Sequence, residues 1–235
     1  SIRALHNLSF VEDPTRAFRA VRFAERFNFK ITKHTENLIK LAIRMNIFEK
    51  LSGTRIYDEL MLTFQETNPV KTIKRLADYG LLKVIHPKLI FSSGLEILLQ
   101  SVHDTVTWFD LLFLEEHFEK GLIFVMALLQ KLGKDDRESA LERLNVPPVP
   151  KERINRGLDD AQDIVKKLQF DNPVKNYRLL HGKDIVHVLL SMALAQDNDK
   201  KKAVSQYLLE LRRVKPELTG EDLKKLGILP GPVYS

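Results

Sequence analysis

Apolar residues recur along the chain at intervals of three and four positions, the spacing of helices that bury one face. We find no sustained alternation of apolar and polar residues, which would indicate half-buried strands. The pattern therefore predicts an all-α fold. After an extended lead-in over residues 2–10, helices are predicted over residues 14–27, from a cap at Thr32 or Thr35 to Met45, from Ser52 or Thr54 onward, and over residues 69–79, 94–100, 107–118, 121–132, 134–144, 151–168, 173–180, 182–195, 199–213 and 221–226.

The ranges 107–118 and 121–132 are rich in leucine and aromatic residues, so we expect them to form the central core. The residues expected there are Trp108, Phe109, Leu111, Leu112, Phe113, Phe124 and Met126. A proline cluster over residues 147–150 marks the best candidate for a boundary between domains.

Residues 11–27 contain the most distinctive predicted helix, the one over residues 14–27. The carboxylate of Asp13 can accept backbone N–H groups of the first turn, and Pro14 suits the first helical position. At ~100° per residue, three arginines fall within an arc of roughly 60°, with a fourth beside them. The three are Arg19, Arg22 and Arg26, and the fourth is Arg16. Because arginine presents a planar, forked donor, such a stripe favours specific recognition over a merely solvated basic face.

This segment resembles a motif of a known family. The similarity lies in Glu12-Asp13-Pro14-Thr15-Arg16, continuing into Arg19-Ala20-Val21-Arg22-Phe23-Ala24. It resembles the Glu-Asp-x-x-Arg motif of class II tRNA nucleotidyltransferases, which include CCA-adding, A-adding and C-adding enzymes and bacterial poly(A) polymerases. Residues 2–5 resemble the end of that family's head domain, and residues 53–60 resemble its next helical motif. Residues 218–223 and 227–232 resemble a segment of its C-terminal part.

The resemblance implies that Asp13 and Arg16 form a template for the incoming base. Adenine and cytosine both present an exocyclic amine beside an unprotonated ring nitrogen. A carboxylate can accept from the amine, and a guanidinium can donate to the ring nitrogen. Guanine and uracil present the opposite pattern, which would leave buried polar groups unpaired at a cost of ~1–3 kcal/mol each.

The resemblance also implies supporting roles for other charged residues. Arg19 and Arg22 are expected to contact phosphate or to brace Asp13, and Glu12 belongs to the structural part of the motif. Arg55 and Glu59 stand four positions apart on the next motif helix, which is expected to brace the first one. The alternative for Arg55 and Glu59 is an ordinary surface ion pair, worth ~0.3–0.5 kcal/mol.

Composition adds limits to this interpretation. The net charge of +6 and the pI near 9.4 fit an anionic partner such as RNA. The chain has no cysteine, so disulfides and cysteine-based metal sites are excluded, and we expect a cytoplasmic location. No apolar run approaches the ~20 residues of a membrane span, so no membrane partner is expected.

Other candidate sites are less specific. His103-Asp104 lacks further histidine or aspartate ligands at a recognisable spacing, and Asp197-Asn198-Asp199 precedes three lysines, which is typical of a helix cap. Residues 219–232 are interpreted as a turn in preference to a phosphate-binding loop. Basic residues of the last third of the chain could follow an RNA backbone, with no aromatic residues interleaved for base stacking.

The resemblance implies a neck over residues 1–67, a helical body over 68–146, and an RNA-binding tail over 147–235. We expect a fragment that lacks the catalytic head and the Mg²⁺ bound there, with no catalytic or metal-binding residue and no transferase activity of its own. The expected partners are ATP, CTP or both, and the 3′ end of tRNA or another RNA. A fragment of a bacterial poly(A) polymerase, or a non-enzymatic helical module that binds RNA or protein, remains the alternative.

Overall fold

The computed structural model describes residues 1–114, 116–214, 224, 225, 227 and 231. Over these residues the chain is helical, as predicted, and its one strand-like feature is an isolated parallel bridge between Ile2 and Ile31. The elements in chain order are α1 (Ser9–Glu12), α2 (Thr15–Arg26), α3 (Lys33–Arg44), η1 (Ile47–Lys50), α4 (Gly53–Phe64), α5 (Pro69–Asp78), η2 (Leu81–Val84), α6 (Ser93–Asp110), α7 (Lys120–Leu129), α8 (Lys134–Arg143), α9 (Pro148–Lys167), α10 (Pro173–Leu180), α11 (Ile185–Leu194), α12 (Asn198–Leu209) and η3 (Leu211–Arg213).

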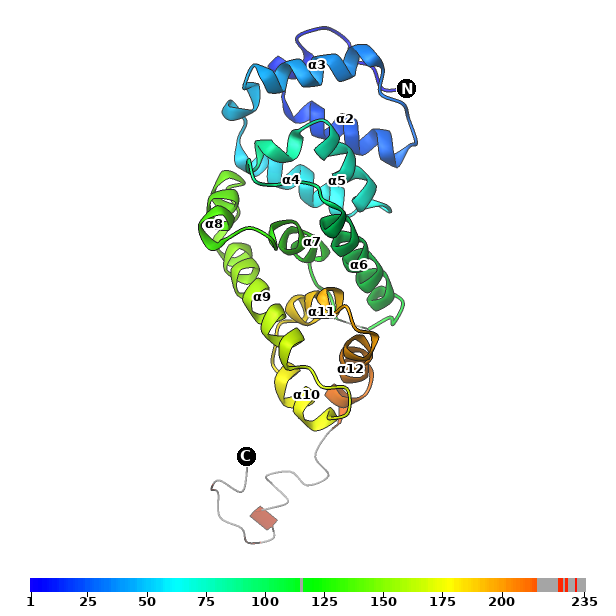
Figure 1. Cartoon of the computed structure of the whole chain (residues 1–235), viewed down its shortest axis with the longest axis vertical. Helices are drawn as coiled ribbons and strands as arrows, with labels where there is room; N and C mark the ends of the chain where they lie inside the picture. Colours follow the sequence, from blue (N-terminus) through cyan, green and yellow to red (C-terminus); the bar gives the residue numbers. More distant parts are fainter. Residues whose placement is uncertain (115, 215–223, 226, 228–230, 232–235) are drawn as a thin grey trace.

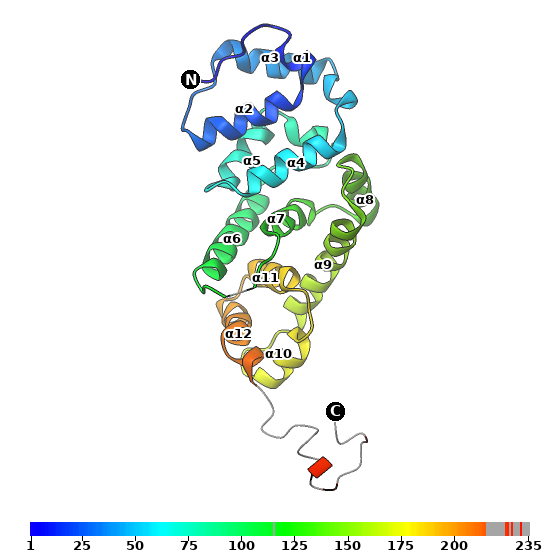
Figure 2. The ribbon, with the colours of Figure 1, turned by 180° about the vertical axis from the view of Figure 1, so that it is seen from behind.

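The helices form an elongated array (Figure 1). The group α1–α5 lies at the end that holds the N-terminus, α6–α9 form the middle, and α10–α12 lie at the other end. The view from behind shows the same order, with α2 between α3 and the α4–α5 pair (Figure 2). The order in space follows the order along the chain only in part, since α11 packs against α6, α7 and α9 of the middle group and lies nearer to them than α10 does.

Helix α7 lies at the centre of the packing because its sequence is apolar on every side. All residues from Gly121 to Leu129 are buried, against α4, α6, α9 and α11. Gly157 on α9 permits a close approach, since a Cβ there would lie 2.4 Å from the Met126 sulfur and 2.6 Å from the His187 ring. One hydrophobic cluster thus connects the elements on both sides of residue 147, and the predicted domain ranges stay a prediction.

Most helix ends follow the predicted caps. The Thr32 hydroxyl accepts the N–H of Thr35 at the start of α3, and the Asn68 side chain accepts the N–H of Lys71 at the start of α5. Gly80 has a φ of +83° just after α5, which is the left-handed conformation expected at a helix C-terminus. Asp197 accepts the N–H of Asp199, so its interpretation as a cap is confirmed.

The predicted bounds of three helices are wrong, namely those over residues 94–100, 107–118 and 151–168. Residues 93–110 form a single helix, α6, and the range 107–118 is not a separate one. Phe113 adopts a φ of +49° and is 87% exposed, and Leu111 is 65% exposed, so neither belongs to the core. The chain has to reverse here because α7 packs back against α6. Helix α9 begins at Pro148, three residues earlier than predicted, since proline is tolerated in a first turn.

The lead-in is also corrected, because α1 (Ser9–Glu12) includes the last two residues of the segment predicted to be extended over 2–10. Ile2 does lie extended beside residues 30–32: its N–H donates to the Lys30 carbonyl at 2.8 Å, and its carbonyl accepts from Thr32 N–H at 3.0 Å. The predicted helix over residues 221–226 and the turn over 219–232 lie largely outside the described residues. No helix in the described part of the chain is long and apolar enough to span a bilayer.

Candidate nucleotide-binding site

Asp13 lies in the turn between α1 and α2, with 22% of its side chain exposed. Its Oδ1 accepts the backbone N–H of Thr15 at 3.2 Å and the hydroxyl of Thr15. The predicted placement is one residue off: Pro14 occupies the N-cap position and α2 begins at Thr15, whose N–H the Asp13 carboxylate accepts from the position before the cap. These bonds fix the orientation of the carboxylate relative to the axis of α2.

Arg55, in the first turn of α4, holds the same carboxylate from the other side. Its Nη2 donates to Asp13 Oδ1 at 2.8 Å and to the Thr15 hydroxyl at 2.9 Å. Burial raises the pKa of Asp13, but the hydrogen bonds from Thr15 and the charge of Arg55 outweigh it. The net pKa is lowered from the ordinary 3.8, so the carboxylate is ionised at neutral pH.

Arg16 lies one helical turn from this carboxylate. Its Nε is 3.8 Å from Asp13 Oδ2, the oxygen that Arg55 and Thr15 do not contact. Its Nη1 donates to the Ser9 carbonyl at 3.4 Å and lies 3.8 Å from Glu12, which is also 3.5 Å from His6. The Arg16 side chain is 46% exposed and lines a hollow of about 340 Å³ together with Arg19, Phe23 and residues 2–5. Arg16 therefore lines a space that opens to solvent, and the Asp13 carboxylate lies next to Arg16 without lining that space itself.

Arg22 serves a different purpose from the one predicted. It is 8% exposed, and its guanidinium donates to Glu59 at 3.1 and 3.2 Å and to Glu66 at 3.2 Å. It lies over the ring of Phe23, 4.6 Å from the centroid, and contacts no described atom of Asp13. Arg22 therefore fastens α2 to α4 and is not available for phosphate.

The other arginines of the stripe remain accessible. Arg19 is 50% exposed and 3.8 Å from Glu59, and Arg26 is 53% exposed and 3.7 Å from Glu66. Arg19 keeps its expected role as a candidate for phosphate contact. Arg55 and Glu59 do not pair with each other among the described contacts; each binds α2 instead, which excludes the simple surface pair within α4.

The C-terminal half of α2 is held by α5. Glu25 is 8% exposed, binds Arg75, and lies 3.2 Å from the ammonium of Lys71. With the contacts of α4, this anchors α2 along its whole length, so the Asp13–Arg16 edge lies on a rigid element. A rigid support favours base recognition because little ordering is needed on binding.

Candidate metal ligands do not converge in the described residues, where no group of three or more histidine, cysteine, aspartate or glutamate side chains is placed so that it could hold a metal ion. His86 is buried and lies 3.6 Å from Asp136, and its Nδ1 accepts the N–H of Lys88 at 3.3 Å. His103 and Asp104 lie on α6, where Asp104 accepts from Gln100 at 2.8 Å. The described residues therefore do not fit a resident metal ion.

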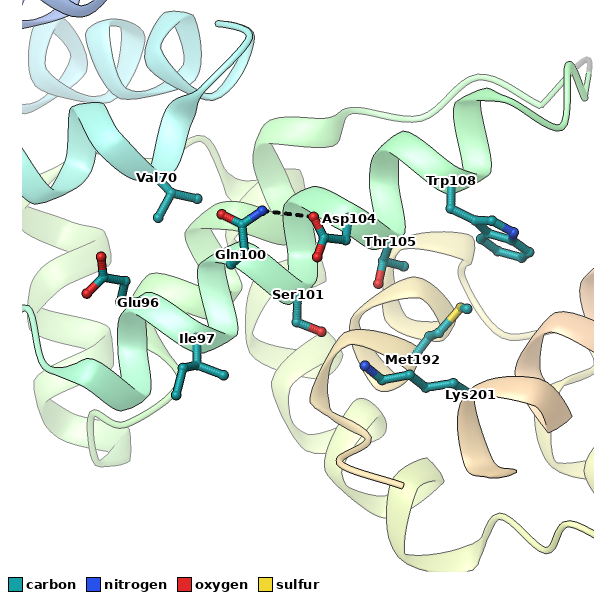
Figure 3. A pocket seen from close by; sticks show the side chains of 10 residues that line it. All are labelled: Val70, Glu96, Ile97, Gln100, Ser101, Asp104, Thr105, Trp108, Met192 and Lys201. Atoms are coloured by element: carbon teal, nitrogen blue, oxygen red, sulfur yellow. Dashed lines mark hydrogen bonds between the residues drawn. The ribbon is translucent and has the colours of Figure 1, made fainter. Parts of the chain in front are cut away.

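A separate hollow of about 650 Å³ lies between α6 and the α11–α12 region (Figure 3). Trp108, predicted to be central, lines this hollow above Met192 and is only partly buried. The polar groups at its centre are already satisfied, since Gln100 donates to Asp104 and Ser101 donates to the Ala193 carbonyl, both at 2.8 Å. The hollow therefore offers few free polar groups to a ligand.

One aromatic residue of the tail was missed. Phe170 is 58% exposed at the turn between α9 and α10, and the Lys202 ammonium lies 5.8 Å from its ring centroid. An exposed ring beside a cation is suited to stacking on an unpaired base. The sequence gives one indication of its exposure, because Phe170 comes directly before the turn residues Asp171-Asn172-Pro173 and shortly after Lys166 and Lys167.

Comparison with known proteins agrees with this geometry. Residues 28–91 match the family model described as "Probable RNA and SrmB-binding site of polymerase A". The chain is 39% identical, over its whole length, to an A-adding tRNA nucleotidyltransferase of Geobacter sulfurreducens, and 29% identical over 97% of its length to one of Aquifex aeolicus. The resemblance to the tRNA nucleotidyltransferase family is confirmed. The chain spans 27% of the length of each of these two relatives.

Solved structures of tRNA nucleotidyltransferases share the fold. A Thermotoga maritima CCA-adding enzyme complexed with tRNA superimposes with a TM-score of 0.82 at 26% identity, over 99% of this chain and 57% of that one. A tRNA-processing enzyme in its apo form superimposes with a TM-score of 0.77 at 29% identity, over 97% of this chain and 60% of that one. The predicted helical architecture of this family is thereby confirmed.

Proposed function

We propose that this chain supplies the base-selecting helix and part of the RNA-binding surface of a nucleotidyltransferase that adds AMP, CMP or both to tRNA 3′ ends. The observation that carries the proposal is the paired edge of Asp13 and Arg16. One carboxylate oxygen is held by Arg55 and Thr15, and the other faces Arg16 at 3.8 Å. Arg16 lines the adjoining hollow, so a base held there would meet the Arg16 donor with the Asp13 acceptor beside it.

The selection follows from hydrogen-bond pairing. Asp13 would accept from the exocyclic amine of adenine or cytosine, and Arg16 would donate to the neighbouring ring nitrogen. Guanine and uracil would bring a carbonyl toward the carboxylate and an N–H toward the guanidinium. Because the carboxylate is ionised and held in place, it cannot reverse its role to suit them.

Among the activities of the family, addition of A is favoured, because the relative with 39% identity over the whole chain is named A-adding, whereas the CCA-adding structure that covers 99% of the chain is 26% identical. The match to the Neisseria gonorrhoeae multifunctional CCA protein covers only 34% of this chain. A poly(A) polymerase is the second candidate, supported by the description of the family model. The Asp13–Arg16 edge accepts A and C alike and does not separate these activities.

We further propose that ATP, CTP or both, together with an RNA 3′ end, are the partners, and that the protein acts in the cytoplasm. The Mg²⁺ ions of phosphoryl transfer would be held by carboxylates outside the described residues, which do not converge on a metal site. The role of the described residues is to choose the base and to bind RNA.

The test is nucleotide choice in the full-length enzyme. Asp13→Asn preserves the shape of the side chain but replaces an acceptor with a donor, so incorporation of A and C should fall relative to G and U. Arg16→Ala should weaken discrimination in the same direction. Arg178→Ala, which removes an exposed arginine without a described partner, is the matched control. Unchanged choice among ATP, CTP, GTP and UTP in both test variants would refute the proposal.

A further inference from the structure

Two hollows adjoin the C-terminal half of α3 and share Ile43 in their walls. The first has a volume of about 810 Å³ and is lined by Lys40 and Arg44 of α3. The second, of about 250 Å³, is lined by Lys83 of η2 and by Arg143. We call the surface formed by Lys40, Arg44 and Lys83 the α3–η2 cationic surface.

These three cations are exposed and have no ion-pair or hydrogen-bond partner among the described residues. Most other cations of the same region are neutralised by carboxylates. Lys33 pairs with Glu36, and the cations of α5 pair with glutamates of α2 and α6; these are Lys71, Lys74 and Arg75. The α3–η2 cationic surface is therefore left with uncompensated positive charge.

The arrangement is unfavourable without an anion. Lys40 and Arg44 stand four positions apart on α3, where like charges repel. The carbonyl groups at the end of α3 attract Arg44, which lies in the last turn. These carbonyl groups do not explain the unpaired charge of Lys83, because Lys83 belongs to η2 and not to α3. Glu49 is the acidic residue in the wall of the second hollow, and it has no described partner either.

We propose that the α3–η2 cationic surface binds the phosphate backbone of RNA. The proposal rests on the proposed function for its RNA partner and assigns that partner a contact surface. The matched family region, residues 28–91, contains all three cations, and its description names both RNA and a protein as partners. Clustered unpaired cations favour RNA, because each phosphate contact releases a bound counterion.

The position of this surface adds a geometric consequence. Helix α3, which carries Lys40 and Arg44, lies beside the base-selecting helix α2 in both views, at the end of the array away from the tail (Figures 1 and 2). Phosphate contacts here would help to hold an RNA end near Asp13 without reading its sequence.

The experiment measures binding of the full chain to tRNA and to an unrelated RNA duplex across a range of salt concentrations. The test variant is Lys40→Gln/Lys83→Gln, with Arg44→Gln added in a second variant. The control is Lys131→Gln/Lys134→Gln, which removes two exposed lysines without described partners, one in the turn before α8 and one at its first residue. Both double variants lower the net charge by the same amount.

We expect the test variant to bind both RNAs more weakly and to reduce the slope of log K against log salt by about 2, while the control keeps the parent slope. The melting temperature of the test variant should not fall, since loss of the Lys40 charge relieves its repulsion with Arg44. Unchanged affinity and slope in both test variants would overturn the proposal and leave a protein as the occupant of this surface. If the parent protein bound no RNA, both this proposal and the RNA-binding part of the proposed function would fail. If RNA binding weakened as expected but the Asp13 variant kept the parent's choice of nucleotide, only the base-selecting role would fail.

Discussion

Arg55 Nη2 donates to Asp13 Oδ1 at 2.8 Å, although 42 positions separate the two residues. The contact joins the first turn of α4 to the turn before α2. It means that the carboxylate proposed to read the base is oriented by a second helix. The geometry of the site therefore depends on how α2 and α4 pack.

This contact predicts a pH effect. Arg55→Ala removes a positive charge from Asp13 and leaves its burial, so the pKa of Asp13 should rise toward or above its ordinary 3.8. A lowered pKa keeps the ionised form down to a more acidic pH; the variant should therefore lose that form, and its discrimination between bases, at a higher pH than the parent. Carboxyl ¹³C NMR titration of Asp13 measures the shift. Arg178→Ala should leave the titration in place, and an unmoved pKa in Arg55→Ala would contradict the assignment.

The buried Arg22 predicts non-additive stability. Glu59→Gln leaves Arg22 with one charged partner, Glu66, and with a glutamine carbonyl that can still accept, and should cost about 0.5–1.5 kcal/mol in the free energy of unfolding. Glu59→Gln/Glu66→Gln leaves a buried guanidinium without a carboxylate and should cost about 3–5 kcal/mol. Urea unfolding measures each value. Glu152→Gln, which breaks an exposed pair with Arg156, should change stability by less than about 0.5 kcal/mol. A double variant no worse than the sum of mild single effects would refute this account.

Gly53 predicts a steric requirement at the start of α4. A Cβ at this position would lie 2.1 Å from the Arg143 carbonyl oxygen, which belongs to the backbone of α8 and cannot turn away. Gly53→Ala should therefore destabilise the protein by about 1–3 kcal/mol. Gly94 is the matched control, since its Cβ would meet only the Lys131 ammonium at 2.9 Å. Gly94→Ala should be neutral or stabilising by up to about 1 kcal/mol, and equal effects at both glycines would be the contrary result.

Tyr57 predicts a gain in stability on loss of a hydroxyl. Its phenol is buried without a hydrogen-bond partner, and burial, with the nearby Glu119 and Asp58 carboxylates, raises its pKa to about 12. Tyr57→Phe should raise the free energy of unfolding by about 1 kcal/mol. Tyr79→Phe should lower it by about 1–2 kcal/mol, because the Tyr79 hydroxyl donates to Glu36 at 2.9 Å. Thermal unfolding of the two variants should give shifts of opposite sign.

The helices and caps were predictable because they depend on neighbours along the chain. Asp13, Thr32, Asn68 and Gly80 mark helix ends through local hydrogen bonds or backbone conformation. The pairing of Arg55 and Glu59 was not predictable in the same way. Their spacing shows that they share a face of α4, but which partners they meet depends on the crossing of α2 and α4.

The segment after α6 shows a second limit. Leu111 and Phe113 continue an apolar pattern, yet both are exposed because the chain turns to bring α7 into the core. The apolar pattern predicts which residues could be buried, but it does not show which other elements pack against them. The proximity of Asp13 and Arg16 was predictable from one helical turn, whereas the burial of Arg22 required the positions of Glu59 and Glu66.

Ile2 forms two main-chain hydrogen bonds, one with Lys30 and one with Thr32. They close residues 2–32 into a loop that contains α1 and α2. These bonds hold the segment that follows Ile2 against the end of the loop after α2. Because residues 2–5 line the hollow beside Arg16, the same two bonds set the position of one wall of the space in which a base would lie.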